Sequence, residues 1–404
     1  MPNPLHDLAA AGVAVWLDDL SRPLIDSGAL VAAVERDGVI GITTNPTIFA
    51  KAIGAGTGYD EHLRDLALRG TAIGETVRLL TAWDVRAACD ILRPVFERTG
   101  GRDGCVSIEV DPRISGDTDR TVAEARGLWW LVDRPNLYIK IPATDAGLPA
   151  ISTCLAEGMS VNVTLVFSVA RYEAVLDAFL TGLERQVAAG ETLAGVESVA
   201  SFFLSRVDTE VDRRLAECDE PAEDVDHLRG QAAIANARVA YGVWEDSLAS
   251  PRWQALKGAR PQRLLWASTG VKDKALDDTR YVVELVGPET VNTMAEATLR
   301  AVADHGRIRP GTVRSAIGAP QAILDELERL GVDMTDVANT LEAKGVASFE
   351  ASWNELIASV TEQLKRAGAK VMPAGAVSPA AGQDTPGDAP AAAAPEQSRN
   401  GVRA

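Results

Sequence analysis

Short apolar runs alternate with longer amphipathic stretches along this chain. The short runs are rich in β-branched and aromatic residues, which favours strands. The stretches between them place apolar residues three and four positions apart, which predicts helices that pack by one face. Eight strand candidates result, at residues 13–18, 38–45, 105–111, 136–142, 159–167, 198–205, 263–269 and 281–287.

Strands that alternate with helices pair in parallel. Eight such units predict an α/β fold, namely a closed (β/α)8 TIM barrel with additional helices. An open doubly wound sheet would fit the same alternation. The additional helices are expected to cover the barrel from positions after the eighth run, at 294–304, 320–330 and 334–367.

The pattern ends near residue 370. We expect residues 1–370 to form one barrel domain with added C-terminal helices, since a single α/β barrel routinely uses this much sequence. Residues 371–404 are dominated by Ala, Pro and Gly and contain no aromatic residue. Such a composition buries too little apolar area to offset the entropy of ordering, so this segment is predicted to be a disordered tail.

Composition and charge narrow the functional classes. The hydrophobic share of 46% and the charged share of 24% are typical of soluble globular proteins. No apolar run is long enough to span a bilayer, and the N-terminus lacks a signal-like pattern, so we expect a cytoplasmic protein. A net charge of -17 disfavours nucleic acid and anionic membrane as partners. An anionic substrate would therefore need a local basic pocket.

The cysteines and histidines predict neither a disulfide framework nor a metal site. The four cysteines lie far apart, with no CxxC pair and no nearby histidine partner. The four histidines lie in helical or terminal segments, which disfavours histidine catalysis.

One strand candidate carries a lysine at its centre. Lys140 lies between Ile139 and Ile141, and it is one of only eight lysines among 40 basic residues. A lone lysine near a strand end more often reaches solvent or pairs with a carboxylate. Polar residues at the ends of the other predicted strands, described next, make that interpretation less favoured.

Polar residues recur near the ends of the predicted strands. Alternate residues of a barrel strand point inward, and catalytic groups lie at the carboxyl ends. In each strand, the alternate positions, which point outward, are largely apolar. We therefore expect one mouth to contain Asp18, Asn45, Glu109, Lys140, Asn162, Thr164, Ser201 and Ser268.

This set predicts carbonyl chemistry. Burial disfavours the charged form of an amine, and a neutral amine is a nucleophile that forms a Schiff base with a carbonyl. The resulting iminium accepts electrons when a carbon–carbon bond breaks. Proton transfers then need carboxylates, and Asp18 and Glu109 are the two within reach.

Two motifs resemble the transaldolase family. "GITTNPTIF" at 41–49 resembles its N-terminal signature, and "LYIKIPAT" at 137–144 resembles the segment that carries its Schiff-base lysine. Further matching segments extend the resemblance over roughly residues 13 to 306. The length and the long helices are similar to the larger, actinobacterial-style branch.

The resemblance implies a role for each matching residue. Lys140 matches the nucleophile, and Asp18 matches the acid/base at the cleaved bond. Glu109 matches the carboxylate that handles a catalytic water, which Thr164 helps to hold. The substrate-binding matches are Asn45 and Asn162 for hydroxyl groups, Ser201 and Phe203 for the pocket wall, and Arg206 for the phosphate.

Two positions depart from the family pattern. In "ASTGVKD", Ser268 fits, but Gly270 occupies the place of a second phosphate-binding arginine, for which Lys272 is the expected substitute. Ala295 replaces a proline at a helix start, which costs little.

Simpler interpretations accompany three of these assignments. The Asn45–Pro46 pair could mark only a turn. Arg206 could pair with Glu210 at helical i,i+4 spacing. Lys272 could be a solvated loop charge.

The implied function is a cofactor-free, metal-independent transfer of a dihydroxyacetone unit. The resemblance implies sedoheptulose 7-phosphate or fructose 6-phosphate as donor and glyceraldehyde 3-phosphate or erythrose 4-phosphate as acceptor, in the non-oxidative pentose phosphate pathway. Sugar phosphates are therefore the expected partners, and a homo-oligomer is compatible with the sequence.

Two rival functions remain. A fructose 6-phosphate aldolase is expected to carry Gln and Tyr in place of Glu109 and Phe203, so transfer is favoured. A barrel without catalysis could serve as a scaffold, with the tail as its interaction segment. The presence of Lys140, Asp18 and Glu109 argues against it.

Overall fold

The computed structural model describes residues 3–218, 221, 225–315 and 320–367. The predicted tail, 371–404, lies outside the described residues.

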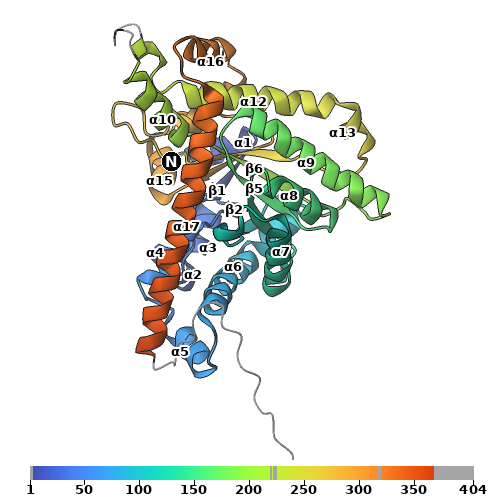
Figure 1. The fold of residues 1–404 in the computed structure, drawn as a ribbon, viewed down its shortest axis with the longest axis vertical. Coiled ribbons are helices and arrows are strands. Elements are labelled where there is room, and N and C mark those ends of the chain that lie inside the picture. Colours follow the sequence, from blue (N-terminus) through green and yellow to red (C-terminus); the bar gives the residue numbers. More distant parts are fainter. Residues whose placement is uncertain (1–2, 219–220, 222–224, 316–319, 368–404) are drawn as a thin grey trace, which may run out of the picture.

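Within the described residues, eight parallel strands form a closed barrel in chain order (Figure 1). The barrel closes where β8 pairs with β1, with Leu17 opposite Met294. The predicted barrel is thus confirmed, and the open sheet is excluded. The strands are β1 Val13–Leu17, β2 Gly41–Ile42, β3 Cys105–Glu109, β4 Leu137–Pro142, β5 Val161–Val166, β6 Ser198–Phe203, β7 Arg263–Ala267 and β8 Thr290–Met294.

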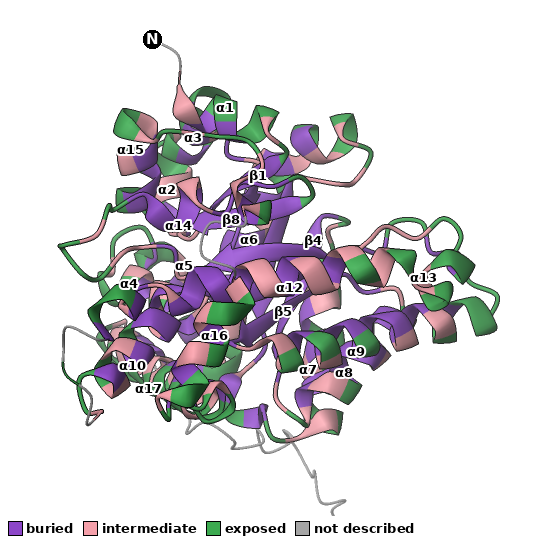
Figure 2. Cartoon of the chain, turned by 90° about the horizontal axis from the view of Figure 1, so that it is seen from above, coloured by how far each residue is buried: buried purple, intermediate pink, exposed green. Residues whose placement is uncertain are grey.

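The strands form the core of the molecule. Every strand residue is buried, and the outer helices expose one face (Figure 2). Burial on both faces explains why the strand runs are almost continuously apolar. At Gly41 a Cβ atom would lie 2.3 Å from the ring of Trp16, so β2 needs glycine to approach β1.

Helices surround the barrel. Several begin at a side-chain cap, such as Asp117 before α7 and Ser168 before α9, which satisfies a free backbone N–H. The helices up to β6 are α1 Pro4–Ala10, α2 Arg22–Asp26, α3 Ala29–Arg36, α4 Pro46–Gly54, α5 Asp60–Leu68, α6 Ile73–Arg98, η1 Pro112–Ile114, α7 Thr118–Val132, α8 Gly147–Ala156 and α9 Val169–Ala188. Those after β6 are α10 Ser205–Leu215, η2 Asp226–Leu228, α12 Ala232–Ala249, α13 Pro251–Ala255, α14 Arg280–Val283, α15 Glu296–His305, η3 Thr312–Arg314, α16 Pro320–Arg329 and α17 Met334–Arg366.

The prediction of the eighth strand was wrong. Residues 280–283 form the helical turn α14, and the strand comes later, at 290–294. In the misread run the buried residues Tyr281 and Leu285 lie four positions apart, as do Val282 and Val286, which is a helical spacing. The same error placed the start of the next helix at residue 294, whereas α15 begins at Glu296.

The predicted C-terminal helices are present, and α17 covers the carboxyl end of the barrel. It packs along α4 and also contacts α6, α10, η1 and β5 (Figure 1). The first residues of α4 and α10, and η1, directly follow strands β2, β6 and β3, so they mark the carboxyl ends. Helix α17 therefore brings distant residues to the barrel mouth.

Candidate active site

A cavity of about 320 Å³ opens at the carboxyl end of the barrel. Its walls come from six strands or the residues that follow them, and from α17. Seven of the predicted site residues line it: Asp18, Asn45, Lys140, Ser201, Phe203, Arg206 and Ser268.

Lys140 is enclosed in this cavity, with only 4% of its surface exposed. Its Nζ atom donates a hydrogen bond of 3.0 Å to the carbonyl oxygen of Thr44. The same atom lies 3.4 Å from Oε2 of Glu109, the residue opposite it on β3. Lys140 therefore does not reach solvent; it pairs with a buried carboxylate.

Glu109 is buried beside the amine. Burial raises the pKa of Glu109 to about 7, and the positive charge of Lys140 opposes that rise. Apart from the ion pair, neither carboxylate oxygen has a hydrogen-bond partner in the described part of the chain. At neutral pH this carboxyl group can therefore both give and accept a proton.

Thr164 is a second buried group that can still form a hydrogen bond. It is fully buried on β5, and its hydroxyl has no hydrogen-bond partner among the described residues. Its register partner on β4 is Pro142, two residues after Lys140. The next residue, Leu165, has a positive φ of 61°, and the pairing of β5 with β6 shifts there.

Asp18 directly follows β1 and is held by hydroxyl groups. Its Oδ1 accepts a hydrogen bond of 2.6 Å from Thr43. The Thr43 hydroxyl also lies 2.6 Å from that of Thr293 on β8. The carboxylate is thereby oriented by strands on both sides of β1. The sequence analysis did not single out either threonine, although Thr43 lies in the "GITTNPTIF" motif.

Asn162 and Ser201 form a buried chain of hydrogen bonds. Ser201 donates to the side-chain oxygen of Asn162 at 2.7 Å, and the Asn162 amide donates to Ser107 at 3.0 Å. Ser201 lines the cavity, whereas Asn162 is fully buried behind it. Asn162 thus fixes the orientation of Ser201.

Asn45 has two local roles. Its side-chain oxygen accepts a hydrogen bond from the backbone of Ile48 and caps α4, with Pro46 as the first helical residue. The Asn45–Pro46 pair therefore marks the start of a helix and not merely a turn. Asn45 also lines the cavity, where its amide nitrogen makes no hydrogen bond within the described residues.

Arg206, in the first turn of α10, points a free guanidinium group into the cavity. Among the described residues it makes no hydrogen bond or ion pair, because Glu210 is occupied by Arg213, Arg214 and Lys344. The alternative pairing with Glu210 is therefore wrong. Burial lowers the pKa of Arg206 from its ordinary value, a sign of partial desolvation.

The loop after β7 contributes one predicted residue and not the other. Ser268 lines the cavity with a positive φ of 55°, and its hydroxyl lies 2.9 Å from that of Ser205. Lys272 is exposed and lines a separate hollow with Asp208 and Asp212. The structure therefore does not bring Lys272 to the cavity, and an exposed ammonium group keeps its hydration there.

The sequence analysis missed Phe349. This residue of α17 lines the cavity, and its ring centre lies 5.7 Å from Nζ of Lys140. Only the tertiary fold brings α17 to β4, so no local pattern could have identified it.

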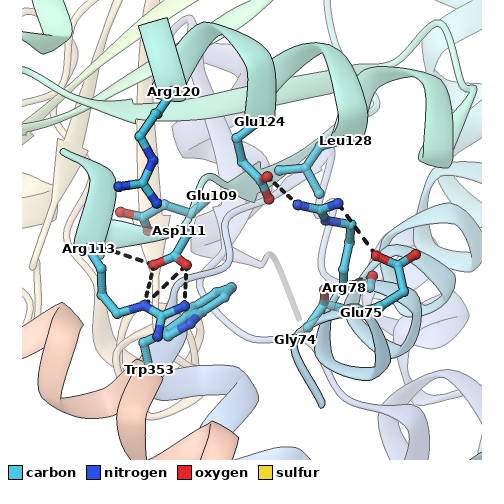
Figure 3. A pocket seen from close by; sticks show the side chains of 11 residues that line it. Gly74, Glu75, Arg78, Glu109, Asp111, Arg113, Arg120, Glu124, Leu128 and Trp353 are labelled. Atoms are coloured by element: carbon cyan, nitrogen blue, oxygen red, sulfur yellow. Dashed lines mark hydrogen bonds and ion pairs between the residues drawn. The ribbon is translucent and has the colours of Figure 1, made fainter. Parts of the chain in front are cut away.

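Glu109 does not line this cavity but lines a second one, of about 520 Å³, between α6, α7, η1 and α17 (Figure 3). Arginines and carboxylates alternate around it. Arg113 pairs with Asp111, and Arg78 lies between Glu124 and Glu75 (Figure 3). Most of these charges are therefore neutralised by one another.

Neither a metal cluster nor a membrane span emerges from the described residues. No group of three or more His, Cys, Asp or Glu residues in that part of the chain could hold a metal ion. No helix in it is long and apolar enough to cross a bilayer.

Comparison with known proteins identifies close relatives. Residues 15–360 match the Transaldolase/Fructose-6-phosphate aldolase family. A transaldolase of Acidothermus cellulolyticus is 59% identical over 369 residues, which cover 91% of this chain and 98% of the relative. A transaldolase of Thermobifida fusca is 60% identical over 366 residues, with 90% and 99% covered. Transaldolase 1 of Streptomyces coelicolor is 58% identical over 366 residues, with 90% and 96% covered.

Proposed function

This chain belongs to the transaldolase family and is an enzyme of the transferase class with transaldolase function, and we propose that Lys140 is its Schiff-base nucleophile. The proposed reaction transfers a dihydroxyacetone unit from sedoheptulose 7-phosphate or fructose 6-phosphate to glyceraldehyde 3-phosphate or erythrose 4-phosphate. The observation that carries the proposal is the position of Nζ, enclosed in the cavity and 3.4 Å from Glu109.

The first step forms the covalent link. Nζ of Lys140 attacks the C2 carbonyl carbon of the donor, and the carbonyl oxygen leaves as water when the iminium forms. That departure requires a proton. Glu109 can supply it because its pKa is raised to about 7, and the free hydroxyl of Thr164 can help to hold the water.

The second step breaks the carbon–carbon bond. Asp18 takes the proton of the C4 hydroxyl, the C3–C4 electron pair moves into the iminium, and the first aldose leaves. The enamine that remains on Lys140 attacks the aldehyde carbon of the acceptor, whose oxygen receives a proton from Asp18. Water then adds to the new iminium with Glu109 as base, and the ketose is released.

Glu109 supports transfer rather than simple cleavage. The family includes aldolases, which are expected to have an amide at this position and a tyrosine at position 203. Here a carboxyl group faces the amine, and Phe203 brings no hydroxyl group. Water activation is thereby tied to the protonation state of Glu109, so the enamine persists until an acceptor arrives.

Arg206 is the proposed partner of the substrate phosphate. It is the cation of the cavity that no carboxylate of the described residues neutralises, so its N–H groups remain available. Bidentate hydrogen bonds from a guanidinium group suit a phosphate well. We propose that Asn45 and Ser201, which also line the cavity, hold sugar hydroxyl groups.

The catalytic unit is proposed to be residues 1–370, acting in the cytoplasm. The family match ends at residue 360, and the relatives cover about nine-tenths of the chain. Removal of 371–404 should therefore leave kcat/KM unchanged. A large loss of kcat in the shortened chain would contradict this division.

Reductive trapping tests the proposed function. The protein is incubated with fructose 6-phosphate and borohydride, and the modified peptide is identified by mass spectrometry. A three-carbon adduct on Lys140 is expected, because the enamine remains after the aldose leaves and equilibrates with its iminium. No adduct on Lys140, or one spread over surface lysines such as Lys274, would overturn the proposal.

A further inference from the structure

The aromatic ring of Phe349 lies against both cations of the cavity. Its centre is 5.7 Å from Nζ of Lys140 and 5.9 Å from Cζ of Arg206, and only 3% of the residue is exposed. A cation near the face of an aromatic ring is attracted by the ring's quadrupole. The attraction grows as the two groups are withdrawn from water; here Lys140 and Phe349 are buried and Arg206 is half-buried.

Arg206 has a second ring on it. The centre of Phe203 lies 5.1 Å from Cζ, so two phenylalanines from different elements contact one guanidinium group. Cation–π contacts of this kind use none of the N–H donors of the guanidinium group. Arg206 uses none of these donors in a hydrogen bond or ion pair with the described residues. It is therefore held by rings while its donors stay available for a ligand.

Helix α17 is built to approach this point closely. A Cβ atom at Gly345, one turn before Phe349, would lie 3.0 Å from the side chain of Leu165 and 3.7 Å from the guanidinium group of Arg206. Glycine therefore allows the helix backbone to lie against β5 and Arg206.

Two polar contacts fix α17 on both sides of Phe349. Lys344 forms a 2.9 Å ion pair with Glu210 of α10. The hydroxyl of Ser352 lies 2.8 Å from that of Thr47 on α4. The position of the ring is thus set by the elements that also carry Arg206 and Asn45.

We propose that Phe349 is a specificity-determining positioning residue, which together with Phe203 clamps Arg206 in the orientation that binds the phosphate of the sugar. The inference rests on the proposed function and adds a residue on α17 to its phosphate site.

The test replaces the ring in two ways. Phe349→Leu keeps an apolar side chain but removes the ring, and Phe349→Tyr keeps the ring. KM and kcat are measured with fructose 6-phosphate and with unphosphorylated fructose as donors. A desolvated cation–π contact of about 1 to 2 kcal/mol corresponds to roughly a five- to thirtyfold rise in KM for the phosphorylated donor in Phe349→Leu. The unphosphorylated donor should change less than about twofold, and Phe349→Tyr should resemble the wild type.

Leu356 provides the matched control. It is fully buried on the same helix but lines neither cavity. Leu356→Ala should lower thermal stability as a core truncation does, without changing the preference for phosphorylated donors. If it changes that preference as much as Phe349→Leu does, the effect belongs to helix packing and the clamp is refuted.

A double-mutant cycle keeps the proposal testable even if Phe349→Leu is destabilised. In an Arg206→Ala background, Phe349→Leu should cause no further rise in KM for the phosphorylated donor, because the ring acts through the arginine. Additive effects would overturn the clamp.

Borohydride trapping at Lys140 should persist in Phe349→Leu. A wild-type protein that gives no adduct would refute the proposed function, whereas normal trapping with unchanged phosphate preference would refute only the clamp.

Discussion

Two cavities lie on the two sides of the Lys140–Glu109 ion pair, and they differ in how their charges are used. Glu109 lines the larger cavity and Lys140 lines the smaller one. The larger one, of about 520 Å³, is lined by three arginines and several carboxylates, which mostly pair with each other (Figure 3). The smaller one, of about 320 Å³, contains Lys140, which pairs with the buried Glu109, and Arg206, which pairs with no carboxylate of the described residues; both face aromatic rings. A charge already neutralised by the protein has little left to offer a ligand. The smaller cavity is therefore the candidate active site, although it has less volume and fewer charges.

Burial sharpens the contrast. Arg113 is 42% exposed and Arg78 is 36% exposed at the side chain, so their ion pairs are partly hydrated and each contributes about 1 kcal/mol or less. Lys140 and Glu109 are withdrawn from water, where removal of one partner leaves an uncompensated charge. Substitutions at Arg78 or Arg113 should therefore have smaller effects on activity than substitutions at Lys140 or Glu109.

Loss of the amine should have the largest effect. Lys140→Ala removes the nucleophile, and transfer should fall about 10⁴-fold or more, as for other nucleophile deletions. Coupled assays of aldose phosphate release measure this. Lys257→Ala, at an exposed position, is the matched lysine control and should retain full activity. Substantial transfer by Lys140→Ala would mean that another amine, or no amine, carries the reaction.

Glu109→Gln should have the next largest effect, because it removes the buried carboxylate that lies 3.4 Å from Nζ of Lys140. Transfer should decrease about 10²-fold or more, the usual contribution of general acid–base catalysis. Release of dihydroxyacetone should decrease less, so the ratio of cleavage to transfer should rise. Product ratios measured by chromatography test this. A variant with wild-type transfer would show that Glu109 does not handle the water.

The raised pKa of Glu109, about 7, adds a pH signature. Below that pH the carboxyl group is mostly protonated and cannot act as a base, so kcat should decline as the pH falls through about 7. Glu109→Gln has no titrating group there and should lack this limb. The measurement is kcat against pH for both proteins at saturating donor. The same limb in Glu109→Gln would assign it to another group.

Arg206→Ala should have a smaller and more selective effect. Charge-assisted hydrogen bonds contribute about 1.5 to 3 kcal/mol, so KM for phosphorylated donors should rise roughly ten- to a hundredfold. Turnover of unphosphorylated donors should change little, because the guanidinium group lies away from the reacting bond. Equal losses with both kinds of donor would assign Arg206 a purely structural role.

The sequence revealed the strand-end residues because alternation within a strand is a local rule. The positions of Asp18, Lys140 and Ser201 follow from counting along single strands, and the cavity brings them together. Counting fails where a run is ambiguous, as at Tyr281, whose neighbours suit a helical turn as well as a strand.

Contacts between elements that are distant in the sequence could not be predicted from alternation within a strand. Phe349 lies on a helix that follows the whole barrel, past residue 306 where the recognised resemblance ended, whereas the family match continues to residue 360. The position of Lys272 likewise depends on the path of a loop, and its spacing from Ser268 in the sequence does not determine it. The alternative ion pair between Arg206 and Glu210 was also wrong, because Glu210 pairs with three other residues.

The smallest effect is expected at Arg78, an ion-paired arginine that lines the larger cavity. Arg78→Ala removes ion pairs to Glu124 and Glu75 but no group that contacts the reacting atoms. Values of kcat/KM should stay within about threefold of the wild type, because partly exposed ion pairs contribute about 1 kcal/mol or less.

The same variant should change stability in a pH-dependent way. Burial already raises the pKa of Glu124, and Arg78 opposes that rise, so the pKa should increase further without the arginine. A carboxyl group whose folded-state pKa is raised keeps its full stability below the unfolded pKa and loses stability as pH rises through the folded value. The deficit in Tm of Arg78→Ala should therefore be larger at pH 8 than at pH 4. A loss of kcat/KM as large as that of Arg206→Ala would instead show that Arg78 contributes to the reaction, and the distinction between paired and unpaired charges would fail.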